Sequence, residues 1–161
     1  MRKLTLASAR RTLPLNVRNH FLKEVIMAKL KLVTYFKITL EDKPGTLLAV
    51  AKEMKSKNLG LLALWGYGTQ PGQGWLYCIP KNPDKFRNAY KPSGMQMEEG
   101  SGLFLKGTDK TGALVKTLET IAKEGVNIMA IHAVAAGGNY GSFIRVGPGD
   151  VEKAAKALGA K

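Results

Sequence analysis

Residues Asp109–Val134 read DKTGALVKTLETIAKEGVNIMAIHAV, and residues Asp42–Tyr67 read DKPGTLLAVAKEMKSKNLGLLALWGY. The two stretches lie 67 positions apart and align without a gap, with aspartate, lysine, glycine and apolar residues at matching places. A repeat of this length exceeds the period of helical solenoids and indicates two copies of one small fold. The sequence therefore predicts a duplication around which the rest of the chain is organised.

The first copy begins with a strand and a helix. Leu30–Leu40 alternates loosely and is rich in β-branched and aromatic residues, which predicts a strand. Asp42 follows and is expected to cap the next helix with its carboxylate, while Pro44 suits a first helical position. Apolar residues at helical spacing from Leu47 to Met54 predict this helix, which is expected to end near residues 58–60.

A hairpin and a second helix complete the first copy. Leu61–Tyr67 and Trp75–Ile79 are apolar runs, and Gly68–Gly74 between them predicts a long, flexible loop. Pro83–Tyr90 is a short helix candidate, and Met95–Glu99 is a candidate fourth strand. The first copy is therefore predicted to have the order β-α-β-β-α-β.

The second copy repeats this order but ends early. Only three residues follow Leu158, too few for a fourth strand, so this sheet is expected to have an unfilled edge unless another segment pairs there. The predicted elements are a strand at Gly102–Gly107, a helix at Ala113–Lys123, a strand at Val126–Val134, a turn at Ala135–Asn139, a strand at Tyr140–Val146 and a helix at Asp150–Leu158.

The strand leading into Asp-Lys-Pro-Gly, the amphipathic helix after it, and the Gly-Val-Asn-Ile opening of the next strand resemble the ACT domain. The second copy has Thr111 where the family favours proline. The resemblance implies an α+β fold of two ferredoxin-like βαββαβ modules with antiparallel sheets. These modules would cover residues 30–100 and 101–161, after a basic N-terminal arm at residues 1–29.

ACT domains bind small ligands, most often amino acids, and regulate metabolic enzymes, so the resemblance implies a ligand-sensing regulatory protein. A glycine-containing turn at a helix N-terminus suits a carboxylate, because it offers free N–H groups and a partial positive potential. By position, the resemblance places the ligand at Asp42, Pro44, Gly45, Asp109, Thr111, Gly112 and Asn127, with Trp65 and His132 as pocket walls.

The two candidate sites are not equivalent, because the first copy has Gly60 where the second has Asn127. We favour a site that pairs the turn of one module with the second strand of its neighbour. Structural roles remain open for the same residues: helix caps for the two aspartates, ordinary turns for the glycines, a backbone hydrogen bond for Asn127, and packing for Trp65 and His132.

The composition is that of a globular protein, with 161 residues of which 45% are hydrophobic. The only cysteine, Cys78, lies in an apolar run and is expected to be a small buried residue, which excludes a disulfide framework within one chain. No apolar run approaches the ~20 residues that span a bilayer, so no membrane partner is expected. These features favour the cytoplasm.

The net charge of +13 is unevenly distributed, and more than half of it lies within residues 1–33. Met27 opens the run that leads into the first copy. Residues 1–26 could therefore lie upstream of the native start, form a basic arm that contacts a partner, or be a targeting segment, and all three interpretations remain open.

RNA binding is the main rival function, because RNA-recognition motifs share the βαββαβ order. Residues 139–146 resemble their aromatic strand, but Ser142 is an extra residue that would move Phe143 to the opposite face. Nucleic acid is therefore not the expected partner. A purely structural subunit without a small ligand is the other alternative.

An enzyme is not expected, because the two histidines, His20 and His132, lie in different segments and no nucleophile–histidine set is present. No metal or cofactor is expected either. The sequence thus predicts a non-catalytic protein that binds an amino acid or similar small carboxylate between modules and controls a metabolic enzyme. The expected unfilled sheet edge further predicts a homo-oligomer.

Overall fold

The computed structural model describes residues 29–160. The predictions for the N-terminal arm therefore lie outside the described residues, apart from Lys29, the first residue of a strand. Within the described range, none of the helices is both long and apolar enough to span a bilayer.

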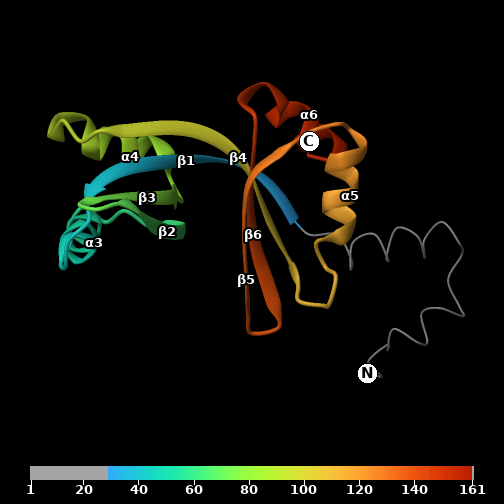
Figure 1. Cartoon of the computed structure of the whole chain (residues 1–161), viewed down its shortest axis with the longest axis horizontal. Coiled ribbons are helices and arrows are strands. Elements are labelled where there is room, and N and C mark those ends of the chain that lie inside the picture. The colour runs from blue at the N-terminus through green and yellow to red at the C-terminus, as the bar shows by residue number, and fades with distance from the viewer. Residues whose placement is uncertain (1–28, 161) are drawn as a thin grey trace, which may run out of the picture.

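The described chain forms one six-stranded sheet with the strand order β2-β3-β1-β4-β6-β5, and all neighbouring strands are antiparallel (Figure 1). The strands are β1 (Lys29–Glu41), β2 (Leu61–Gln70), β3 (Gln73–Pro80), β4 (Met97–Thr108), β5 (Ile128–Ala136) and β6 (Asn139–Val146). The α-helices are α3 (Thr46–Ser56), α4 (Pro83–Tyr90), α5 (Val115–Lys123) and α6 (Val151–Ala157), and 3₁₀ turns cover Lys91–Ser93 and Pro148–Asp150.

Strands β1 and β4 pass through both halves of the molecule and join them (Figure 1). Residues 36–41 of β1 pair with β3 in the first module, and residues 29–32 of β1 pair with residues 106–103 of β4 in the second. The N-terminal part of β1 thus takes the place of the last strand of module 2. The edge that was expected to be unfilled is therefore filled from within the chain.

Strand β4 has the complementary double role. The sequence predicted separate strands at Met95–Glu99 and Gly102–Gly107, but β4 runs without a break from Met97 to Thr108. Its first half is the last strand of module 1, and its second half is the first strand of module 2. The predicted boundary at residues 100–101 falls inside this shared strand.

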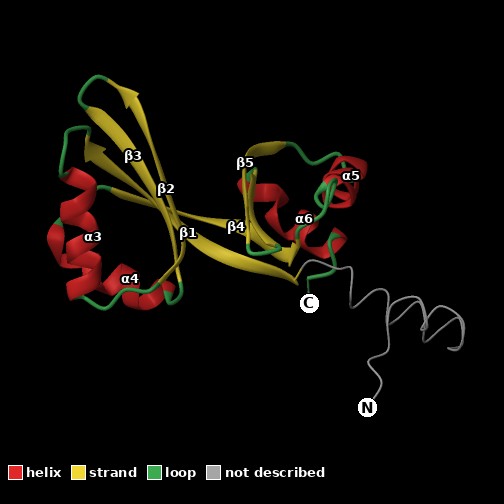
Figure 2. Ribbon diagram, turned by 90° about the horizontal axis from the view of Figure 1, so that it is seen from below, coloured by secondary structure: helices red, strands yellow, loops and turns green. Residues whose placement is uncertain are grey.

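Each module has its own core, between its part of the sheet and its two helices (Figure 2). The core of module 1 consists of Phe36, Ile38, Val50, Met54, Leu76, Cys78, Phe86 and Tyr90, and that of module 2 of Leu103, Leu105, Ile121, Val126, Tyr140, Ile144, Val146, Val151, Ala154 and Ala155. Burial raises the pKa of the Cys78 thiol to about 12, so this cysteine is an unreactive core residue.

Both hairpins are tighter than the sequence predicted. The expected loop at Gly68–Gly74 is wrong, because β2 continues to Gln70 and β3 begins at Gln73. In the second hairpin the turn is Gly137-Gly138, with φ angles of 58° and 74°. Two positive φ angles match the right-handed twist of the flanking strands, and glycine adopts them without steric cost.

The aspartates of the two repeat turns do not cap their helices, which corrects the prediction. Helix α3 begins at Thr46, after Gly45, and has no side-chain cap, so Pro44 also lies before the helix. The Asp42 amide instead donates to the Gly72 carbonyl at 3.1 Å, and the Asp109 amide donates to the Gly138 carbonyl at 2.9 Å. Each aspartate therefore ties the end of a strand to the adjacent hairpin turn.

Candidate functional site

The two repeat turns lie at opposite ends of the sheet, where β1 leads into α3 and β4 leads into α5 (Figure 1). Gly45 and Gly112 have φ angles of 91° and 78°. A Cβ atom on Gly45 would meet no atom within 4 Å, and one on Gly112 would lie 3.7 Å from Val115 Cγ2. Glycine is therefore needed at both positions for its backbone conformation and not for close packing.

Helices α3 and α5 both begin without a side-chain cap and without an acidic residue in the first turn. Helix α4 differs, because Asn82 Oδ1 accepts a hydrogen bond from the Lys85 amide at 2.9 Å and Asp84 lies in its first turn. The first amides of a helix have no partner inside it. Within residues 29–160, the amides of Leu47, Leu48, Lys116 and Thr117 also have no acceptor outside their helices.

A hydroxyl group and carboxylates lie near these free amides in the sequence. The Thr46 hydroxyl, at the start of α3, is buried and has no hydrogen-bond partner in the described part of the chain. Asp42 and Asp109 are exposed, and their carboxylates take part in none of the ion pairs between described residues. Each turn therefore combines N–H donors for an anion with a carboxylate for a cation.

A pocket of about 310 Å³ adjoins the second turn. Its lining includes Asp109 and Gly112 of the turn, Leu118 of α5 and Val134 of β5. The other predicted residues lie outside this group: Thr111 is exposed beside the pocket, and Asn127 is exposed just before β5, at the end of this strand away from Gly138. The structure thus brings the turn and the C-terminal end of β5 together but leaves Asn127 apart within this module.

Trp65 and His132, the predicted pocket walls, lie on the two edge strands β2 and β5. The sheet curves so strongly that their ring centroids are 4.7 Å apart, and the Tyr67 hydroxyl shares a hydrogen bond of 2.8 Å with His132 Nε2. Both residues line a pocket of about 550 Å³ between the edge strands. Whether they contact a ligand remains a prediction.

An aromatic cluster fills the helix-free face between the modules. Trp65 stacks on Tyr77 at 5.4 Å with an interplanar angle of 4°, and its ring lies 5.1 Å from that of Phe143. Tyr77 and Phe143 are only 7% and 3% exposed, so neither presents an open ring face. Burial and the nearby charge of Arg145 lower the pKa of His132, which keeps its imidazole neutral near neutral pH.

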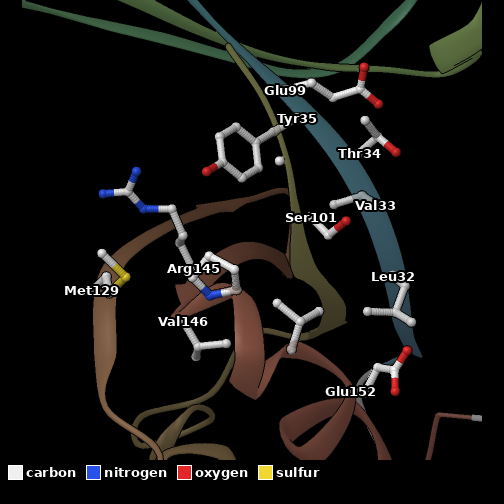
Figure 3. Close-up of a pocket in the computed structure, with 13 residues that line it drawn as sticks. Leu32, Val33, Thr34, Tyr35, Glu99, Ser101, Met129, Arg145, Val146 and Glu152 are labelled. Carbon is white, nitrogen blue, oxygen red and sulfur yellow. The ribbon is translucent and has the colours of Figure 1, made fainter.

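Sequence reasoning missed a pocket beside this cluster, which Arg145 and Tyr35 help to line (Figure 3). The repeat did contain a feature that could have indicated this pocket. Arg145 lies at a position where the first copy has an aliphatic residue. Among residues 29–160, no three His, Cys, Asp or Glu side chains come together as a metal site.

No protein-family model and no curated protein matches the sequence. Solved structures do match. Protein BT0572 from Bacteroides thetaiotaomicron is 26% identical, with a TM-score of 0.70 over 80% of this chain and 88% of that one.

Two regulatory proteins are similar at lower identity. The ligand-free regulatory subunit of aspartate kinase from Thermus thermophilus is 16% identical, with a TM-score of 0.59 over 83% of this chain and 96% of that one. The corresponding subunit from Thermus flavus is 18% identical, with a TM-score of 0.58 over 83% and 95%. The ACT-domain fold that the sequence predicted is therefore confirmed, and the chain carries it as two modules in one continuous sheet, with β1 supplying the last strand of module 2.

Proposed function

We propose that this chain is a non-catalytic regulatory protein that binds an amino acid, or a similar small carboxylate, at its repeat turns and thereby controls a metabolic enzyme. The observation that carries the proposal is the pair of uncapped helices, α3 and α5, each preceded by a left-handed glycine and an unpaired aspartate. The likeness of the fold to regulatory subunits of aspartate kinase supports the regulatory role.

The chemistry of each turn matches both ends of an amino acid. The free amides at the start of the helix would bind the α-carboxylate, helped by the partial positive charge of the helix N-terminus. The carboxylate of Asp42 or Asp109 would bind the α-ammonium group. The buried Thr46 hydroxyl would find its missing partner in a ligand at the first turn, whereas Ala113 takes that position in the second copy.

A second copy of the chain is the proposed neighbour that completes each site. The same positions carry exposed apolar side chains in both modules: Leu48 and Val115 at the helix starts, Leu62 and Met129, and Leu64 and Ile131 on the edge strands. Such matching patches on unpaired edges are typical of surfaces that associate. Association of two copies would place the edge strand of one module against the turn of the other.

Regulation would follow from linkage. A ligand that bridges two modules binds their docked arrangement better than the separated one, and shifts the equilibrium only by this difference in affinity. The partner enzyme would respond to the docked arrangement. The rival function, RNA binding, is disfavoured because Tyr77 and Phe143 on the helix-free face are buried against Trp65 and do not present open stacking surfaces.

A thermal-shift screen of the twenty amino acids tests this proposal. An amino acid at a hundred times its dissociation constant should stabilise the protein by about 2.7 kcal/mol. Asp109→Asn and Asp42→Asn should weaken the response without affecting the melting temperature of the free protein, because both carboxylates are exposed. Glu119→Gln, an exposed residue of α5, is the matched control. Absence of any shift, with salt-sensitive retention of RNA, would favour the rival function instead.

A further inference from the structure

A pocket of about 700 Å³ lies near the centre of the chain, where the end of β6 separates from β4 (Figure 3). The pairing of these strands ends at Leu103 and Ile144, and the residues beyond this point diverge. One wall comes from β1 and β4, and the other from β5, β6 and the start of α6. The pocket shares no residue with either repeat turn.

Arg145 lines this pocket without a counter-ion. No carboxylate of residues 29–160 lies within ion-pair distance of its guanidinium group, and its Nε atom is buried without an acceptor. The other arginine in this range, Arg87, binds both Asp84 and Glu99. Buried polar groups without a partner are rare in native proteins, so the Nε of Arg145 indicates a missing acceptor.

The repeat shows that the fold itself does not need this arginine. Arg145 pairs with Ala130 on β5, and the equivalent Ala63 on β2 pairs with Ile79, which is fully buried. An aliphatic side chain therefore suffices at this place in module 1. Arg145 is partly buried, and this loss of water disfavours its charge, so its presence in module 2 calls for a role other than packing.

The surrounding groups define a ligand with two charges. The Tyr35 hydroxyl points toward Arg145 (Figure 3), where it can bind the same anion. Glu99 is already neutralised by Arg87, but Glu152 of α6 is exposed, forms no ion pair with a described residue, and lies at the opposite end of the pocket (Figure 3). The pocket thus holds one uncompensated positive and one uncompensated negative charge.

Apolar side chains line the space between these charges. Leu32 and Val33 of β1 and Val146 of β6 contribute to the walls. A register shift between Ile128 and Ala130 interrupts the ladder at Met129, which also lines the pocket. Bulges of this kind redirect side chains and often adjoin binding sites. A ligand with an aliphatic segment would fit this lining.

We infer that this pocket is a second small-molecule site, which binds a zwitterion with its carboxylate at Arg145 and Tyr35, its aliphatic part along β1, and its ammonium group toward Glu152. Phosphate and other multiply charged anions are poor candidates, because the Glu152 carboxylate repels them. The inference does not rest on the function proposed for the turns, since the two kinds of site share no residue.

Calorimetric titration of the full chain with matched ligands tests this inference. The ligands are the twenty amino acids, 6-aminohexanoate, hexanoate and inorganic phosphate. We expect a zwitterion to bind, phosphate not to bind, and Glu152→Gln to weaken 6-aminohexanoate without changing the affinity for hexanoate. Glu119→Gln on α5 is the control and should leave all affinities unchanged.

Arg145→Ile gives the decisive comparison, because it places in module 2 the side-chain type that module 1 has at Ile79. This variant should fold with an unchanged or higher melting temperature, since it removes a partly buried charge that forms no ion pair with a described residue. The loss of charge-assisted hydrogen bonds should weaken zwitterion binding at least about tenfold.

Three results would overturn the inference. These are the absence of binding by every ligand at millimolar concentration, tight binding of phosphate, and unchanged zwitterion affinity in folded Arg145→Ile. Arg145→Gln provides the same comparison if the isoleucine variant does not fold. The double variant Asp42→Asn/Asp109→Asn separates the two proposals, since it should weaken binding at the turns and leave the affinity of the Arg145 pocket unchanged.

Discussion

The ring of Trp65 lies 4.7 Å from the ring of His132, although the two residues belong to strands at opposite edges of the sheet. They occupy the same position in the two copies of the repeat, so their contact lies on the approximate two-fold axis that relates the modules. This contact joins the modules a second time, in addition to the shared strands β1 and β4. The arrangement of the modules should therefore depend on the protonation state of His132.

The pH dependence of stability tests this relationship. Burial, and then the charge of Arg145, lower the pKa of His132 in the folded protein, while the unfolded chain keeps the ordinary value of 6.5. As pH falls through this value, the unfolded state takes up a proton before the folded state does, so the free energy of unfolding decreases. Urea denaturation should show this loss between pH 8 and pH 5. His132→Gln should flatten the dependence, and identical pH profiles for the two proteins would contradict the assignment.

The aromatic cluster depends on a glycine of β4. A Cβ atom on Gly102 would lie 2.8 Å from Phe143 Cζ and 3.2 Å from the Ile144 carbonyl oxygen. Gly102→Ala should therefore force the Phe143 ring aside and cost about 1–3 kcal/mol in urea denaturation. Gly149→Ala is the matched control, because a Cβ atom there meets nothing within 4 Å. Equal stability of the two variants would show that the ring has room to move.

The pairing of β1 with β4 completes the sheet of module 2, and this pairing leads to a separate prediction. Leu30 pairs with Leu105 and packs against the core of module 2, while its neighbour Lys31 is exposed. Leu30→Ala should reduce the free energy of unfolding by about 1–3 kcal/mol, less than for a fully buried leucine. It should also increase hydrogen exchange in β4 and β6. Lys31→Ala should do neither, and a Leu30 variant as stable as Lys31→Ala would contradict the pairing.

The left-handed conformation of the first repeat turn can be tested by substitution alone. Gly45 has a φ angle of 91° and no steric neighbour for a Cβ atom. Gly45→Ala should cost about 1–2 kcal/mol through backbone strain, and Gly45→Asn should cost less because asparagine tolerates this region. The measurement is urea denaturation of both variants. If alanine had no effect, the turn would have to adopt another conformation in solution.

The repeat predicted most of the fold because its pattern is local. Helix Pro83–Tyr90 has the predicted bounds, since proline starts it and Phe86 and Tyr90 face the core. The shared strands were not predicted, because nothing in the local pattern of residues 29–32 distinguishes a strand that pairs with two modules from an ordinary one. The prediction that Asp42 caps the helix was wrong for a related reason. The left-handed Gly45 lies between Asp42 and the helix, so the helix begins only at Thr46.

The candidate sites also differ in how far the sequence predicts them. The turns around Gly45 and Gly112 follow from the sequence motif, and the structure adds the uncapped helix starts on which the proposed anion binding rests. The Arg145 pocket depends on the divergence of β4 and β6, which no local pattern encodes. Comparison of Arg145 with Ile79 could have revealed it, but only after the hairpins had been aligned by strand register, because β2 contains an extra residue near Gly68.

The central claim is that the starts of α3 and α5 bind the carboxylate of an amino acid. Backbone amide NMR shifts, recorded while an amino acid that stabilises the protein is titrated in, test it most directly. The account predicts saturable shifts at Leu47 and Leu48, at Lys116 and Thr117, or at both pairs, and a weaker affinity in Asp42→Asn and Asp109→Asn. Saturable shifts confined to other residues, with these four amides unchanged, would contradict it.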